Sequence, residues 1–85
     1  MRKTNFEWDD SKNIQNQDKH NISFEFAQYA FADRKRIIAK DIDHSVEEDR
    51  YYCFGKISDE IVTVRFTYRK NKNIWCMLLE KRKEK

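Results

Sequence analysis

The sequence contains no proline and only one glycine, Gly55, so other residues must build its turns. Asparagine, aspartate and lysine are available for this, because they tolerate or stabilise turn conformations. No Pro-, Gly- or Ser-rich stretch marks a linker, and we expect residues 1–85 to form a single small domain. The most apolar run, residues 74–79, is far shorter than the roughly 20 residues that a membrane-spanning helix needs. Membrane insertion is therefore not expected.

Cysteine is also scarce. Cys53 and Cys76 lie in apolar, strand-like surroundings rather than at metal-ligand spacing. The N-terminus has no apolar signal core. These features predict a reduced, cytoplasmic protein.

Charge is abundant but unevenly distributed. The net charge of +3 combines ten basic and thirteen acidic residues over 1–64 with eight basic and two acidic residues over 65–85. A basic, aromatic-bearing end suggests a polyanionic partner such as RNA or DNA. An ordinary solvated surface explains the charge equally well.

The pattern of apolar residues predicts an α+β fold. The segment "NFEWDD" suits a short strand, after which Asp9 or Asp10 caps a polar helix from about Ser11 to His20. Ser23 caps a second, apolar helix over 23–33. Three strand-like segments follow, over 36–42, 50–57 and 60–69. We expect an antiparallel sheet of three to four strands, with residues 73–78 able to pair as an edge strand.

Period-two alternation is clearest over residues 60–69. It places Val62, Val64, Phe66 and Tyr68 on one face, and Ile61, Thr63, Arg65, Thr67 and Arg69 on the other. The two arginines are then about 13–14 Å apart, at a rise near 3.4 Å per residue, which would suit successive phosphates. Arginine placed there for solubility on a solvent-facing strand is an equally simple explanation.

Several motifs resemble a known family. In "FEWDDSKNIQNQDKHNISFEFA" the residues Phe6, Trp8, Asp9, Lys12, Asn13, Asn16, Lys19, His20, Ile22, Phe24 and Ala27 match the N-terminal signature of BrnT toxins of bacterial type II toxin–antitoxin pairs. The segments "DHSVEEDRYYCFGKI" and "VTVRFTYR" are similar to later BrnT motifs, so the resemblance covers about residues 5–69. Asn21 replaces the usual glycine, and asparagine also accepts a left-handed backbone.

The resemblance implies a RelE-like fold and a metal-free endoribonuclease that uses no cofactor. It also implies an antitoxin partner, usually a BrnA-like ribbon-helix-helix protein that would connect the toxin to operator DNA. A homodimer is a further expectation. Metal-free cleavage activates the ribose 2′-OH against the adjacent phosphate, and so needs a base, an acid and cations that stabilise the phosphorane.

Candidate site residues follow from this chemistry. For catalysis we expect phosphate and transition-state contacts from Lys19, Arg50 and Arg69, with proton transfer by His20 or Tyr68. For RNA binding we expect Lys12, Tyr51 and Arg65. Without the resemblance, His20 is better explained as a cap on the last carbonyls of its helix.

The tail, residues 70–85, departs from the family ending I-R-I-F-G-A-G-Y-W-R-K-G-K-K. Back-translation of the tail, shifted by one base, permits I-F-G-A-C-[YF]-W-R-K-G-K-K, which differs from that ending only at the cysteine. We therefore hypothesise that the tail arose by a frameshift in the A-rich codons of residues 70–73. The loss of the family's Arg, Tyr and Trp predicts weak or absent RNase activity, and a non-catalytic antitoxin- or nucleic-acid-binding module is the alternative function.

Overall fold

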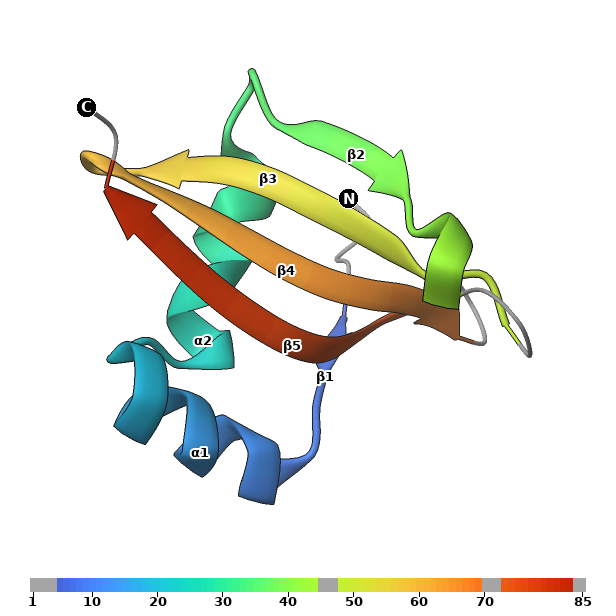
Figure 1. Cartoon of the computed structure of the whole chain (residues 1–85), viewed down its shortest axis with the longest axis horizontal. Helices are drawn as coiled ribbons and strands as arrows, with labels where there is room; N and C mark the ends of the chain where they lie inside the picture. Colours follow the sequence, from blue (N-terminus) through green and yellow to red (C-terminus); the bar gives the residue numbers. More distant parts are fainter. Residues whose placement is uncertain (1–4, 45–47, 70–72, 84–85) are drawn as a thin grey trace.

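The computed structural model describes residues 5–44, 48–69 and 73–83. The frameshift hypothesis places the inserted base in the codons of residues 70–73, and residues 70–72 lie outside the described residues. The elements in chain order are β1 (Phe6–Glu7), α1 (Asp10–His20), α2 (Phe24–Ala27), the 3₁₀ helix η1 (Gln28–Ala32), β2 (Ile37–Lys40), the 3₁₀ helix η2 (Ile42–His44), β3 (Tyr51–Ile57), β4 (Glu60–Arg69) and β5 (Asn73–Lys83). The predicted α+β class is confirmed (Figure 1).

Local signals fix both ends of α1 as expected. The Asp9 carboxylate accepts hydrogen bonds from the backbone N–H groups of Ser11 and Lys12, at 2.8 and 3.3 Å. Asn21 follows the helix in the left-handed conformation, with φ 56° and ψ 37°. The Ser23 hydroxyl then caps α2 by accepting from the Phe26 N–H at 3.1 Å.

The second helix differs from the prediction, because it is α-helical only to Ala27 and continues as 3₁₀ helix. Ala27 and Ala30 are buried against the sheet. A Cβ on Gly55 would lie 2.2 Å from the Ala30 carbonyl oxygen. The one glycine of the chain therefore allows η1 to approach the backbone of β3.

Within the residues that the structure describes, the sheet has five strands in the order β1-β5-β4-β3-β2. The four strands β2 to β5 are antiparallel, whereas β1 pairs in parallel with β5, through Phe6–Ile74 and Glu7–Trp75. The expected three to four antiparallel strands are thus corrected to a mixed sheet of five. The tail forms not a short edge strand but a strand of 11 residues between β4 and β1.

A β-bulge explains why simple alternation fails in β5. Arg65 pairs with Leu78 and Phe66 with Cys76, which leaves Met77 as the extra residue. Before the bulge Ile74 and Cys76 point into the core, and after it Leu79 does. The tail therefore contributes three core residues, and the bulge reverses which alternate positions of the strand point into the core.

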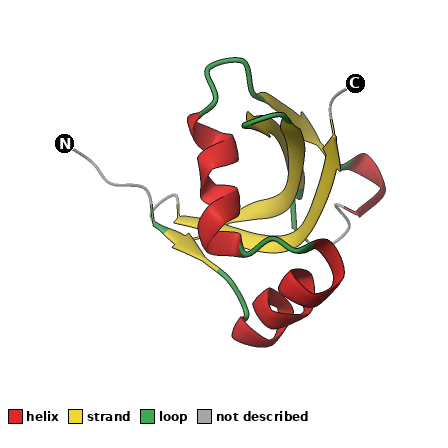
Figure 2. Ribbon diagram, turned by 90° about the vertical axis from the view of Figure 1, so that its left-hand side faces the viewer, coloured by secondary structure: helices red, strands yellow, loops and turns green. Residues whose placement is uncertain are grey.

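The helices cover one face of the sheet, here called the core face. Figure 2 shows the sheet curving around α2 and η1, and α1 packs along β5. The buried apolar residues of this core are Ile22, Phe24, Ala27, Ala30, Cys53, Val62, Val64, Phe66, Ile74, Cys76 and Leu79. None of the described helices is long and apolar enough to cross a membrane.

Candidate functional site

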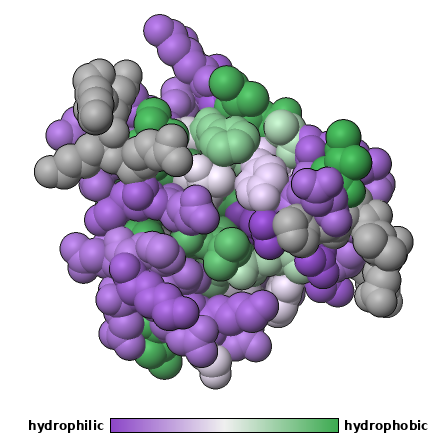
Figure 3. Space-filling view, viewed as in Figure 1, coloured by the Kyte–Doolittle hydropathy of each residue, from purple (hydrophilic) through white to green (hydrophobic). Residues whose placement is uncertain are grey.

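The opposite face of the sheet, here called the open face, is not covered by α1, α2 or η1. Strand register places two rows of side chains across it: Tyr52, Arg65 and Leu78 in one row, and Phe54, Thr63 and Glu80 in the next. Together with Ile61 and Leu79 these residues line a groove of about 350 Å³. Figure 3 shows apolar and weakly polar side chains gathered over the middle of this face, with hydrophilic side chains around them.

Arg65 is held in place at one wall of the groove. Its Nε lies 3.2 Å from Oδ2 of the buried Asp41, and its Nη2 donates a 2.8 Å hydrogen bond to the Tyr52 hydroxyl. Its guanidinium carbon also lies 5.3 Å from the centre of the Tyr52 ring. Asp41 therefore both orients the Arg65 cation and offsets part of its charge.

The polar helix α1 adjoins the groove through its last turns. One hollow of about 160 Å³ is lined by Lys12, Gln15, Asn16, Lys19, His20, Met77 and Leu78. Another, of about 190 Å³, is lined by His20, Thr63, Glu80 and Lys81. Because Leu78, Thr63 and Glu80 also line the groove, the three hollows adjoin one another. Lys12, Lys19, His20 and Arg65, all predicted site residues, are brought together along this path.

Arg69 lies at the far end of the open face. Its guanidinium carbon is 5.2 Å from the centre of a Trp75 ring, and Nη2 is 3.8 Å from a Glu48 carboxylate oxygen. With Glu7, Asn73 and Trp75 it lines a separate hollow of about 360 Å³. Arg69 is six residue steps along β4 from Thr63, about 20 Å at 3.4 Å per residue. The structure thus separates Arg69 from His20.

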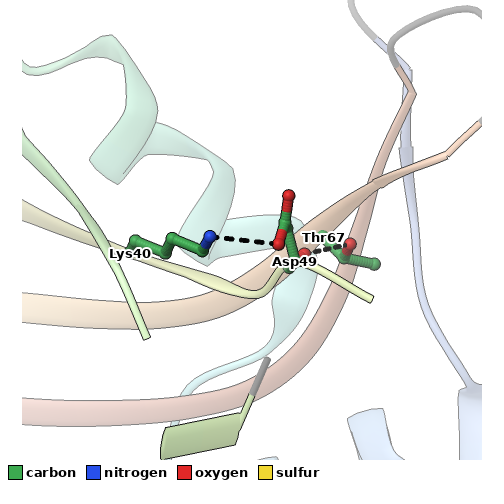
Figure 4. A network of polar contacts seen from close by, with 3 residues as sticks. All are labelled: Lys40, Asp49 and Thr67. Carbon is green, nitrogen blue, oxygen red and sulfur yellow. Dashed lines mark hydrogen bonds and ion pairs between the residues drawn. The ribbon is translucent and has the colours of Figure 1, made fainter. Parts of the chain in front are cut away.

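The segment before β3 explains this separation. The Thr67 hydroxyl donates a 2.6 Å hydrogen bond to the Asp49 carbonyl oxygen, and Lys40 Nζ lies 3.2 Å from the Asp49 carboxylate (Figure 4). Thr67 is consequently buried, although it lies on the open face between Arg65 and Arg69. The backbone at Asp49 covers the strand there and divides the open face into two parts.

Two predicted residues lie on the core face instead. Tyr51 stacks on Phe66, with ring centres 5.7 Å apart, and Tyr68 contacts both rings edge-on at 5.5 and 5.4 Å. Tyr68 is half exposed, while Tyr51 is partly buried. Arg50 directly precedes β3 and is partly buried, and its carbonyl oxygen accepts a 2.7 Å hydrogen bond from the Asp41 N–H. Tyr51, Tyr68 and Arg50 therefore do not line the groove.

Two aromatic residues of the groove were not among the predicted site residues. The rings of Tyr52 and Phe54 are stacked, with centres 5.7 Å apart and planes inclined by 30°. The sequence signal for them was period-two alternation in β3, which places Tyr52 and Phe54 opposite Tyr51 and Cys53. Combined with the pairing of β3 and β4, this alternation puts them on the face of Arg65.

Neither cysteine lies in the groove. Burial raises the pKa of the Cys53 thiol to about 11 and that of Cys76 to about 12, so both are protonated at neutral pH. Among the residues that the structure describes, no group of three or more His, Cys, Asp or Glu side chains is placed to hold a metal ion.

Comparison with known families identifies the chain. Residues 8–76 match the family model described as the ribonuclease toxin BrnT of type II toxin–antitoxin systems. The match extends past Arg69 into β5. A search of individual curated proteins gave no match. A toxin of this kind has RNA as its target and an antitoxin as its partner. The chain therefore belongs to the BrnT family of ribonuclease toxins.

Proposed function

We propose that the chain binds RNA across the open face and acts as a metal-independent endoribonuclease whose rate is reduced by its altered ending. One observation carries this proposal: the Arg65 groove adjoins the hollows lined by Lys12, Lys19 and His20. Cations and aromatic rings along one path are the features that single-stranded RNA requires.

The phosphates are assigned to α1. Lys12 and Lys19 are both exposed and both line the same hollow, seven residues apart and hence on the same side of the helix. α1 exposes Ile14, its only aliphatic residue, so it buries little apolar surface. Its polar surface is explained if phosphate lies against it.

His20 is assigned the proton transfer. A base takes the proton of the ribose 2′-OH, the 2′-oxygen bonds to phosphorus, and the bond from phosphorus to the 5′-oxygen breaks. The 5′-oxygen leaves with a proton, and a 2′,3′-cyclic phosphate remains. His20 lines both the hollow that Lys12 and Lys19 line and the hollow beside Thr63 and Glu80, and we assign it to a phosphate held by Lys19. No metal takes part in these steps.

The remaining predicted residues are assigned to the distal end. Arg69 with Trp75 offers a cation beside an aromatic ring, about 20 Å along β4 from Thr63. We place a later part of the same RNA strand there; Tyr51 and Tyr68, on the core face, and the partly buried Arg50 lie outside this path. Tyr68, half exposed on the core face at this end of β4, stays a candidate for proton transfer only if the RNA also reaches that face.

The reduced rate is supported by the charges of the site. The buried Asp41 carboxylate offsets part of the charge of Arg65, and a Glu48 carboxylate oxygen lies 3.8 Å from Arg69. Glu80, supplied by the tail, adds a negative charge to the groove. Sequencing the gene tests the frameshift hypothesis, which fails if residues 74–84 use codons that cannot give the shifted string.

The function is tested with purified protein and labelled RNA at low and moderate salt. We expect binding that weakens with salt, little cleavage, and a smaller salt dependence in Lys12→Ala/Lys19→Ala. Lys35→Ala, which removes a lysine outside these hollows, is the matched control. Robust cleavage that Arg69→Ala abolishes would contradict the proposed weak activity. In cells, growth arrest rescued by the neighbouring gene would establish the toxin role.

A non-catalytic binding module is the second candidate. It is favoured by the same pairing of Arg65 and Arg69 with acidic residues, which removes cations from catalysis but leaves the groove and lysines intact. RNA that stays whole after long incubation, while binding remains salt-dependent, selects this candidate.

The partner we propose is a BrnA-like ribbon-helix-helix antitoxin. The toxin, as a homodimer, would form a cytoplasmic complex with this antitoxin, and the antitoxin would bind operator DNA. The binding of operator DNA by the toxin with its antitoxin, and not by the toxin alone, is the expected result.

A further inference from the structure

We propose that the groove on the open face is a subsite for one unpaired guanine base of the RNA. The inference rests on the proposed function and adds to it a base preference. It is carried by the five groove residues Tyr52, Phe54, Thr63, Arg65 and Glu80.

The floor of the groove suits the flat face of a base. Tyr52 and Phe54 are stacked on each other and both line the groove, and Leu78 and Ile61 add apolar surface. Nucleobases stack on aromatic rings regardless of their identity. This part of the groove binds a base without choosing among the four.

The edge of the groove supplies the choice. Thr63 and Glu80 are directly paired across β4 and β5, and both line the groove in the row of Phe54. A carboxylate only accepts hydrogen bonds, and it accepts two parallel ones best. Guanine alone among the four bases has two adjacent donors, N1–H and N2–H, on its Watson–Crick edge. The Thr63 hydroxyl can donate to the neighbouring O6.

The opposite wall is rigid. The buried Asp41 carboxylate and the Tyr52 hydroxyl both hold the Arg65 guanidinium, so that the Tyr52 ring is fixed by its own hydrogen bond. Because Phe54 and the Arg65 guanidinium already lie against the Tyr52 ring, the base stacks on Phe54, and the fixed Tyr52 ring supports Phe54 so that little conformational freedom is lost on binding. Asp41 and Arg65 thus act as positioning residues for the aromatic floor.

This arrangement also explains an acidic residue in an RNA site. Glu80 would repel a phosphate but attracts base donors, and the adjoining hollows offer Lys12, Lys19 and Lys81 for the backbone. The base and its phosphate therefore separate, with the base over the sheet and the phosphate beside α1.

The test measures binding of four labelled hexaribonucleotides, U-rich and with G, A, C or U at the third position. All riboses are 2′-O-methylated, so that cleavage cannot occur. Fluorescence anisotropy of the wild-type protein should show about tenfold tighter binding of the G-containing strand, in line with the discrimination that a bidentate base contact gives. Glu80→Gln should abolish that preference, and Phe54→Leu should weaken all four strands.

Matched controls separate these effects from general changes. Asp59→Asn removes an acidic charge from the β3–β4 turn, and Phe26→Leu removes an exposed aromatic ring from α2. Both should leave affinity and preference unchanged. Phe54→Tyr keeps the ring and should retain binding, and circular dichroism confirms that each variant is folded.

The outcomes distinguish the inference from the proposed function. Equal affinity for all four strands, or a preference for A, C or U, overturns the guanine subsite while the salt-dependent binding through Lys12 and Lys19 stands. A guanine preference that survives in Glu80→Gln also overturns it. The absence of any RNA binding overturns both.

Discussion

The two faces of the sheet differ completely, although neighbouring residues of the same strands build them. On the core face Val62, Val64 and Leu79 are almost fully buried beneath the helices. On the open face Arg65, Leu78 and Glu80 line an uncovered groove. Neighbouring residues of one strand thus have different roles: one is buried in the core and stabilises the fold, and the next is exposed to a ligand.

The difference shows how so small a domain can remain stable while one face of its sheet stays uncovered for binding. Helices α1, α2 and η1 all pack on one side or along β5, so a single layer of core supplies the stability. The other side is free to carry aromatic rings and charges. Changes on the core face should therefore affect folding, and changes on the open face should affect RNA.

The largest effect is expected from Gly55→Ala. Its new Cβ would lie 2.2 Å from the Ala30 carbonyl oxygen, so η1 or β3 must move. We expect a loss of about 4 kcal/mol in the free energy of unfolding, a large part of the stability of a small domain. Urea denaturation measures it. Thr63→Ala, on the open face, is the control, and equal stability of both variants would refute the close packing.

The adjacent leucines of β5 give the sharpest comparison. Leu79 is fully buried and Leu78 is 39% exposed on the groove. Leu79→Ala should cost about 3 kcal/mol of unfolding free energy through the cavity it leaves. Leu78→Ala should cost less than about 1 kcal/mol but weaken RNA binding. Denaturation and anisotropy on both variants test this, and a reversal of the two effects would mean that the faces are wrongly assigned.

The burial of the two cysteines on the core face can be tested by the pH dependence of stability. Folding raises the thiol pKa from 9.0 to about 11 for Cys53 and about 12 for Cys76. Their contribution to stability is complete below pH 9 and declines as the pH rises, because only the unfolded thiols ionise there. We expect a loss of about 1 kcal/mol per thiol by pH 10. Urea denaturation from pH 7 to 10 should show a shallower decline in Cys53→Ala/Cys76→Ala.

The smallest effect is expected at Asp33, which joins the end of η1 to β3. Hydrogen bonds from the Lys56 and Lys35 backbone N–H groups lower the pKa of its carboxyl group below 3.8. Its contribution is therefore present above pH 3.8 and is lost as the pH falls through the lowered pKa. The urea midpoint should fall less between pH 5 and pH 3 in Asp33→Asn than in the wild type. Asp59→Asn should behave as wild type.

Local sequence signals predicted the first part of the fold well. Asp9, Asn21 and Ser23 have the expected capping roles, because caps depend on residues only a few positions away. The resemblance to BrnT identified the family from motifs at Phe6 to Arg69. The motif around α1 combines two roles: Asn13 is buried and accepts from the Phe24 N–H at 2.8 Å, whereas Lys12 and Lys19 are exposed.

The features that were missed depend on contacts between distant residues. The bulge at Met77 is set by pairing with β4, and the parallel pairing of β1 needs β5 in place. Tyr52 and Phe54 become part of a site only when β3 lies beside β4. Alternation along one strand shows that a residue faces away from the core, but not which other residues share that face.

The pairing of β1 with β5 has a consequence for the order of folding. Phe6 pairs with Ile74, and the Ile74 N–H donates a 2.9 Å hydrogen bond to the Asn5 carbonyl, across nearly the whole described chain. Pairing β1 with β5 closes a long loop and therefore costs more conformational entropy than pairing β3 with β4, which are joined by a short turn. We therefore expect this junction to form last and to open first, with the Ile74 amide exchanging its hydrogen for deuterium sooner than amides between β3 and β4.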